Sequence, residues 1–233
     1  MQGRLCDLVD GQIQAFPWRD WEIEFKIASN INIHLLEWTL DQERLYENPL
    51  MTGGGQNKIR KLCQAYDIFI PSITGDCFMQ QPFWKLEGEA KIRLQMDFVS
   101  IVRSCGSLGI RTLVVPLVDN GCLETIEQEN VLVDFLLQNQ KLFELNNVQI
   151  VFESDFTPNE LARFIRRLPY QVFGINYDIG NSAALGFNVE EEFEAYGLRI
   201  VNVHVKDRVF GGTTVPLKAG DADFDSVFLG LKK

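Results

Sequence analysis

The feature that most constrains this chain is a regular alternation of short apolar runs with longer amphipathic segments. Six runs are rich in Ile, Val, Leu and Phe: Ile31–Trp38, Ile68–Thr74, Ile110–Val118, Val148–Glu153, Val172–Tyr177 and Leu198–Val205. None of them alternates cleanly between apolar and polar residues, which is typical of parallel strands covered on both faces. The pattern therefore predicts an α/β fold with a parallel sheet.

The segments between these runs have helical spacing and helix-capping residues. In Lys91–Leu108 the apolar residues Ile92, Met96, Val99 and Val102 recur three or four positions apart and predict the buried face of a helix. Glu124–Leu145 has the same spacing. The run Thr157-Pro158-Asn159-Glu160 is typical of a helix start. A first helix is expected at Trp18–Ser29 and a last one at Asp221–Lys233.

The number of predicted strands favours one kind of α/β fold. A short strand at Gln2–Leu5 brings the total to seven, which favours a (β/α)8 TIM barrel over a doubly wound sheet. No GxGxxG or GxxxxGK[ST] motif follows a predicted strand, which also disfavours a nucleotide-binding sheet. Because no composition break is visible, we expect residues 1–233 to form a single domain. The chain stops before an eighth strand, so the barrel is expected to be C-terminally incomplete.

Composition excludes several other classes of protein. Asp and Glu outnumber Lys and Arg by 32 to 22, and the net charge of −10 disfavours a nucleic-acid partner. The five cysteines form no CxxC pair, which disfavours a thiolate zinc site. No apolar stretch is long enough for a membrane span, and the N-terminus does not resemble a signal peptide. We therefore expect a cytoplasmic protein with no membrane partner.

Polar residues stand at or just past the carboxyl end of nearly every predicted strand. They are Glu37, Asp41, Asp76, Asp119, Glu153, Asp155, Asp178, His204 and Asp207. In a TIM barrel this rim is where catalytic groups converge. Asp41, Asp119 and Asp155 are better explained as caps of the helices that follow them.

Glu153, Asp178 and His204 differ from the other rim residues because each is embedded in an apolar run. An unpaired charge in such a position would be costly. Three of these residues on three successive predicted strands therefore need a shared partner. Two carboxylates and one imidazole form a mixed oxygen and nitrogen site, so a bound divalent cation is the partner that we predict.

Four phrases in the chain resemble those of a known family. The opening MQGRL, FESD, NYDIGNSAALG and VHVKDR are similar to the sugar phosphate isomerase/epimerase family, which has the xylose-isomerase-like TIM barrel. The resemblance runs over essentially the whole chain. It implies a divalent metal (Mn, Mg, Zn or Co) held by Glu153, Asp178 and His204, with a fourth ligand on the eighth strand that this sequence lacks.

The resemblance also implies an activity. We expect a metal-dependent isomerase or epimerase of a small sugar or sugar phosphate that works through an enediolate. Glu153 would be both a ligand and the base, as the matching glutamate is in similar epimerases. The expected substrate-binding residues are Glu37, Asp76 and Asp207 at the rim, with Lys206 and Arg208 placed to meet a sugar phosphate. A homo-oligomer is left open.

Three other readings remain beside this one. An inosose-dehydratase-like lyase would share all three ligands, and a non-catalytic barrel fits the missing eighth strand. An apurinic-site endonuclease of the same superfamily is disfavoured, because its zinc cluster needs many histidines and this chain has only His34 and His204. Separately, the segment Val209–Ala219 is predicted to be a mobile loop, because Gly211 and Gly212 are flexible and little apolar content anchors it.

Overall fold

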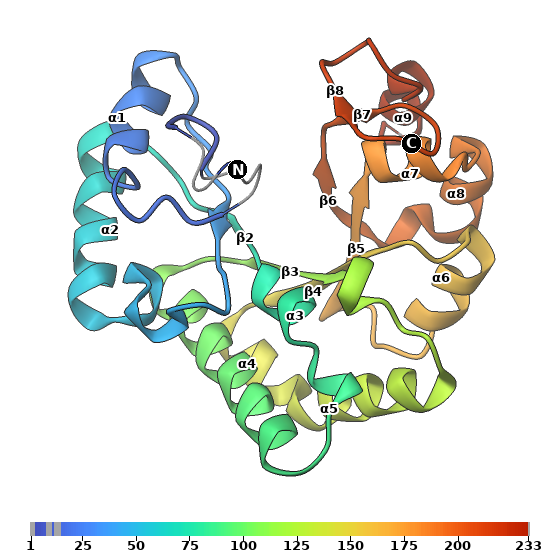
Figure 1. The fold of residues 1–233 in the computed structure, drawn as a ribbon, viewed down its shortest axis with the longest axis horizontal. Helices are drawn as coiled ribbons and strands as arrows, with labels where there is room; N and C mark the ends of the chain where they lie inside the picture. Colours follow the sequence, from blue (N-terminus) through green and yellow to red (C-terminus); the bar gives the residue numbers. More distant parts are fainter. Residues whose placement is uncertain (1–2, 8–10, 12–14, 233) are drawn as a thin grey trace. The chain divides into compact units, whose positions relative to one another are not determined.

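The computed structural model describes residues 3–7, 11 and 15–232 (Figure 1). The chain divides into two compact units, Met1–Gln149 and Ile150–Lys233. Strands and helices alternate along both units, so the predicted α/β class is confirmed.

The first unit contains three parallel strands that neighbour one another in chain order. They are β1 (Trp38–Thr39), β2 (Ser72–Thr74) and β3 (Thr112–Leu117). Trp38 is opposite Ile73, and Ile73 is in turn opposite Leu113. The helices of this unit are α1 (Ile23–Asn30), α2 (Gly53–Tyr66), α3 (Asp76–Gln80), α4 (Gly88–Leu108) and α5 (Ile126–Asn146), with short 3-10 turns η1 (Leu45–Glu47), η2 (Pro49–Met51), η3 (Phe83–Lys85) and η4 (Asp119–Gly121).

Aromatic side chains from α3, α4 and α5 form much of the core of the first unit. The ring of Phe98 lies 4.5 Å from that of Phe78 and 5.3 Å from that of Phe135, measured between centroids. The predicted helix at Lys91–Leu108 is confirmed. Its predicted apolar face is wrong in part, because Ile92 and Met96 are 58% and 64% exposed. Leu94, Phe98 and Ile101 occupy the buried face instead, since several sets of apolar residues in this helix share the same spacing.

The second unit contains β4 (Gln149–Ser154), β5 (Phe173–Asp178) and β6 (Ile200–His204), which are also parallel. Its helices are α6 (Pro158–Ile165), α7 (Ile179–Leu185), α8 (Val189–Tyr196) and α9 (Phe224–Gly230), with a short 3-10 turn η5 (Gly197–Arg199). The predicted start of α6 is confirmed: Thr157 and Glu160 form a capping box around Pro158. Phe152 of β4 packs against Phe164 of α6 with ring centroids 5.1 Å apart.

A β-bulge interrupts the pairing of β5 with β6. Ile175 is opposite Ile200, but the next residue, Asn176, is opposite Asn202, so Val201 is an extra residue in β6. Gly174 makes room for this bulge, because a Cβ atom at position 174 would clash with the Val201 side chain. Beyond the bulge the pairing is regular, and Asp178 is opposite His204.

After β6 the chain forms a β-hairpin. Strands β7 (Asp207–Arg208) and β8 (Thr214–Val215) pair in the antiparallel sense. The predicted loop Val209–Ala219 therefore contains the hairpin turn and β8. The Gly211 amide donates to the carbonyl of Ala184 in α7 at 2.8 Å, so the hairpin lies beside α7 (Figure 1). The mobility of this segment stays a prediction.

Two predicted strands differ from the structure. Gln2 lies outside the described residues, and residues 3–5 are not a strand, because the amides of Gly3 and Leu5 donate to the buried Glu24 carboxylate. Most of Ile31–Trp38 is also not a strand. The amides of Ile31 and Ile33 bond back to carbonyls at the end of α1, which removes them from any ladder. The remaining predicted strands coincide with β2 to β6, within four residues at each end.

Candidate metal centre

The three residues predicted as metal ligands lie at the carboxyl ends of the three strands of the second unit. Glu153 is near the end of β4, Asp178 ends β5 and His204 ends β6. One ligand atom from each residue lies within 4.8 Å of the other two. His204 Nδ1 is 3.1 Å from Glu153 Oε2 and 3.7 Å from Asp178 Oδ2. The structure therefore brings these three side chains together.

The two carboxylates are nearly inaccessible to solvent. Glu153 is 9% exposed and Asp178 is 5% exposed. Burial by itself raises the pKa of Asp178, but a hydrogen bond with His204 and the nearby charge of Lys206 outweigh it. The pKa of Asp178 consequently lies below its ordinary value, so the carboxylate is held in the ionised form that binds a cation.

Two asparagine side chains hold the Glu153 carboxylate. Asn176 Nδ2 donates to Glu153 Oε2 at 2.9 Å, and Asn181 Nδ2 donates to Glu153 Oε1 at 2.6 Å. Asn202 Nδ2 donates in turn to the side-chain oxygen of Asn176, Oδ1, at 2.8 Å. Sequence analysis missed these amides because a neutral polar residue carries no charge signal. The available signal was their position, since Asn176 and Asn202 occur inside apolar runs.

The chain matches the family model described as the xylose isomerase-like TIM barrel, over residues 25–233. This chain belongs to that family. The family assignment confirms the predicted TIM-barrel class, and no curated protein sequence gives a significant match.

Solved structures of similar fold include both metal-bound proteins and a sugar-bound enzyme. A zinc-bound IolI protein is 17% identical, with a TM-score of 0.69 over 91% of this chain and 78% of that chain. A magnesium complex of a xylose isomerase-like TIM barrel protein from Mycobacterium smegmatis is 15% identical, with a TM-score of 0.70 over 95% and 81%. D-Psicose 3-epimerase with D-tagatose, from Clostridium cellulolyticum H10, is 11% identical, with a TM-score of 0.73 over 91% and 75%. At these identities the likeness concerns the fold.

The donor set of this xylose isomerase-like chain fits a divalent cation. Two carboxylates and one imidazole match the ligands that Mg²⁺, Mn²⁺ and Zn²⁺ accept in proteins. Each carboxylate oxygen has two lone pairs, so the hydrogen bonds from Asn176 and Asn181 leave Glu153 with acceptor capacity. The residues present would therefore hold such an ion through Glu153, Asp178 and His204.

The three predicted residues that follow His204 have different surroundings. Lys206 Nζ lies 2.9 Å from Asp178 Oδ2, and its side chain is 31% exposed. Arg208 donates to the Asn181 side chain and to the carbonyl of Gly212. Asp207 is fully buried, and its two oxygens accept from the amides of Gly220 and Ala222. Contact of these residues with a substrate stays a prediction.

Glu37 and Asp76 belong to the first unit. Glu37 Oε2 accepts from the Ser72 hydroxyl at 2.7 Å, and Asp76 Oδ1 accepts from the Thr74 hydroxyl at 2.9 Å. Asp76 is 3% exposed and stands in the first turn of α3. Their predicted contact with the substrate also stays a prediction.

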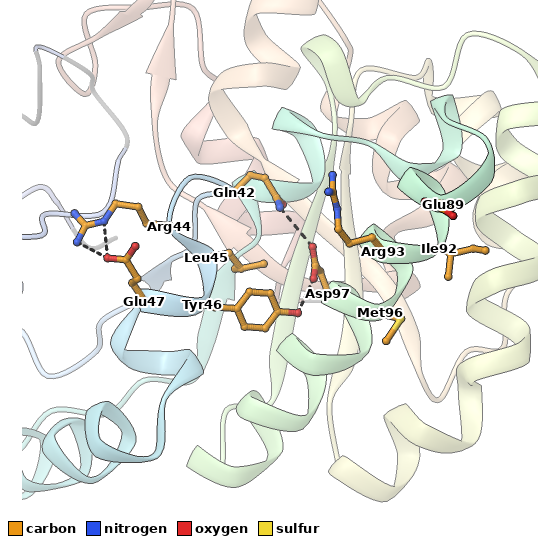
Figure 2. A pocket seen from close by; sticks show the side chains of 10 residues that line it. All are labelled: Gln42, Arg44, Leu45, Tyr46, Glu47, Glu89, Ile92, Arg93, Met96 and Asp97. Atoms are coloured by element: carbon orange, nitrogen blue, oxygen red, sulfur yellow. Dashed lines mark hydrogen bonds and ion pairs between the residues drawn. The ribbon is translucent and has the colours of Figure 1, made fainter.

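The first unit has a cavity of about 610 Å³ that sequence analysis did not predict (Figure 2). It is lined by Gln42, Arg44, Leu45, Tyr46 and Glu47 on one side and by Glu89, Ile92, Arg93, Met96 and Asp97 of α4 on the other. The Asp97 carboxylate accepts from the Tyr46 hydroxyl at 2.6 Å and from the Gln42 amide at 3.4 Å. These neutral donors hold the buried charge.

Among the described residues, no helix combines the length and the apolar character needed to cross a bilayer.

Proposed function

We propose that this protein is a metal-dependent isomerase or epimerase that acts on a small sugar or sugar phosphate in the cytoplasm. One observation carries the proposal. Glu153, Asp178 and His204 converge within 4.8 Å at the carboxyl ends of three parallel strands in a member of the xylose isomerase-like TIM-barrel family. The sugar-bound epimerase of similar fold supports the substrate class.

Each residue of the cluster has a distinct role in this proposal. Asp178 and His204 are ligands, and Glu153 is both a ligand and the base. A bound divalent cation would polarise the substrate carbonyl and so acidify the neighbouring C–H group. Glu153 would take the proton from that carbon. In an isomerase it would return the proton to the neighbouring carbon, whereas an epimerase needs a second acid on the opposite face of the sugar, the role expected of the eighth strand.

The surroundings of Glu153 suit a base whose carboxylate must keep a fixed orientation toward the substrate. The amides of Asn176 and Asn181 bond to its two oxygens and hold the plane of the carboxylate. A base that is held in this way does not have to be reoriented during the proton transfer. Lys206 is the cation that we propose to meet an anionic group of the substrate, because its side chain is partly exposed beside Asp178.

The test follows the proton that Glu153 removes. The protein is loaded with Mn²⁺ and incubated in D₂O with a panel of ketoses, ketose phosphates and an inosose, and deuterium in the recovered compounds is measured by NMR. We expect deuterium at the carbon next to the carbonyl, and we expect Glu153→Gln to abolish its incorporation. Glu191→Gln is the matched control, because Glu191 is exposed on α8.

Three results would count against the proposal. Full exchange in Glu153→Gln would end the role of Glu153 as the base. Loss of water from an inosose in place of isomerisation would assign the alternative lyase activity. Metal binding without exchange on any substrate would favour a non-catalytic barrel.

A further inference from the structure

We propose that Arg208 is a positioning residue that orients Glu153 through the side-chain amide of Asn181. The inference rests on the proposed metal centre and adds to it a connection with the β7–β8 hairpin. Sequence analysis placed Arg208 in contact with the substrate, whereas its hydrogen bonds are made within the chain.

The guanidinium of Arg208 bridges two acceptors. Nη1 donates to Asn181 Oδ1 at 2.8 Å. Nε and Nη2 both donate to the carbonyl oxygen of Gly212, at 3.1 Å and 2.7 Å. A guanidinium has donors in a fixed planar fork, so its position on Gly212 determines where Nη1 points.

Arg208 decides which end of the Asn181 amide faces Glu153. Because arginine can only donate, it pairs with Asn181 Oδ1 and leaves Nδ2 directed at Glu153 Oε1, 2.6 Å away. The reversed amide would bring its NH₂ group against the guanidinium and its oxygen against the carboxylate. Asn181 itself is fixed at the start of α7, where its backbone amide donates to Asp178 Oδ1 at 2.8 Å.

Hydrogen bonds hold the hairpin that carries Arg208 in place. Asp207 accepts from the amides of Gly220 and Ala222 at 3.0 Å and 3.1 Å, which ties the chain after β8 to the start of β7. The Gly211 amide donates to the carbonyl of Ala184 in α7, the helix that carries Asn181. A displacement of the hairpin therefore moves Arg208 and, through Asn181, changes the orientation of the Glu153 carboxylate.

Lysine cannot replace arginine in this role. A lysine ammonium is a single compact group that cannot donate to Gly212 and Asn181 in the same fixed geometry. Arg208→Lys thus keeps the charge and removes the fork, while Arg208→Met removes both. Arg199→Met is the matched control, because half-buried Arg199 also donates twice to backbone carbonyls in this unit, those of Leu168 and Phe173.

The first measurement uses the metal-free protein. NMR hydrogen exchange of the Asn181 side-chain amide reports whether Arg208 holds it. We expect exchange at least about 10-fold faster in Arg208→Met and Arg208→Lys, and no change in Arg199→Met. Unchanged exchange in both Arg208 variants would overturn the proposal, and this result is independent of whether the protein binds a metal.

The second measurement is the Mn²⁺ affinity of the full chain, determined by electron paramagnetic resonance. Removing a residue that orients a ligand typically weakens metal binding by about 10-fold or more. We expect that loss in Arg208→Lys and in Asn181→Ala, and no further loss in the double variant, because both changes interrupt the same connection. Independent losses that multiply in the double variant would overturn the connection through Asn181. A wild-type protein that binds no Mn²⁺ would contradict the proposed function, and the amide exchange would then decide the role of Arg208 alone.

Discussion

Two buried glutamates of the second unit, Glu153 and Glu192, have opposite kinds of surroundings. Glu153 shares its space with an imidazole and a second carboxylate, and two amides hold it. Glu192 is 2% exposed, and its carboxylate accepts from three hydroxyl groups: Tyr177 at 2.8 Å, Ser182 at 2.6 Å and Tyr196 at 2.6 Å. Burial of a carboxylate is common to both, so burial alone does not identify a metal ligand.

The two glutamates differ in the side chains that contact their carboxylates. Three hydroxyl groups donate to Glu192, and among the described residues it belongs to no cluster of acidic, His or Cys side chains that could hold a metal ion. Burial and the charge of Glu192 raise the pKa of Tyr177 and of Tyr196, so both phenols stay protonated and keep donating. We therefore expect the Glu192 group to stabilise the fold, whereas the Glu153 group is the proposed cation site.

The largest expected effect is the loss of metal affinity when Glu153 is replaced by Gln. Glu153→Gln removes one negative ligand, and we expect the Mn²⁺ affinity to fall by about 100-fold, or about 2.7 kcal/mol. The free energy of unfolding of the metal-free protein should fall by only about 1 kcal/mol, because an isosteric amide keeps part of the hydrogen bonding. Isothermal titration and urea unfolding measure the two quantities. An affinity within about threefold of the wild type would contradict the comparison.

At Glu192 the two effects should be reversed. Glu192→Gln leaves three hydroxyl groups around one acceptor oxygen in place of two, and we expect the free energy of unfolding to fall by about 2 kcal/mol. The Mn²⁺ affinity should stay within about twofold of the wild type. Glu194→Gln, on an exposed position of the same helix, is the control for both measurements. A large loss of metal affinity in Glu192→Gln would show that the two groups are one site.

Asp207 offers a third carboxylate, held by backbone amides. Burial raises its pKa, but the amides of Gly220, Ala222, Lys218 and Arg208 outweigh this effect and the pKa lies below its ordinary value. A lowered pKa means that the folded state favours the ionised form, so the stabilisation is complete above the ordinary pKa of about 3.9. It is then lost as the pH falls through the lower pKa of the folded state.

The corresponding experiment compares Asp207→Asn with the wild type by urea unfolding between pH 7 and pH 3. We expect the variant to be less stable at pH 7, by less than Glu192→Gln, and the difference to shrink below about pH 4. Asp134→Asn, at an exposed position of α5, is the control. A difference that grows as the pH falls would contradict the assignment.

The smallest expected effect concerns Lys206. Its ammonium lies beside Asp178, so it repels a divalent cation and competes for the same carboxylate oxygen. Lys206→Met should therefore raise the Mn²⁺ affinity by about threefold at low salt, and the gain should shrink as salt is added. Lys232→Met, at an exposed position, is the control. A lower affinity in Lys206→Met would show that Lys206 supports the cation site.

The sequence was most informative where apolar residues surround a polar one. The strands β4, β5 and β6 could be predicted because buried parallel strands have continuous apolar runs, and Glu153, Asp178 and His204 were conspicuous inside them. Ile31–Trp38 has the same composition, but the amides of Ile31 and Ile33 bond to the end of α1, and composition does not record which acceptor an amide finds.

Neutral residues were the least predictable part of the site. Asn176 and Asn181 both bond to Glu153, yet Asn176 lies inside β5 and Asn181 in the first turn of α7, where an asparagine is equally compatible with a structural role. The link from Gly212 through Arg208 to Asn181 depends on a hairpin whose pairing the sequence did not indicate. Contacts between residues far apart in the chain are set by packing, so a local pattern does not contain them.

The bulge at Val201 has a consequence for how this family member can change in length. Because Val201 is the extra residue, a one-residue insertion or deletion before Asn202 would alter the size of the bulge and leave Asn202 opposite Asn176. The same change between Asn202 and His204 would turn the imidazole to the other face of the sheet, since side chains alternate along a strand. We therefore expect one-residue insertions and deletions to be tolerated before Asn202. Between Asn202 and His204 we expect them to abolish the proposed metal site.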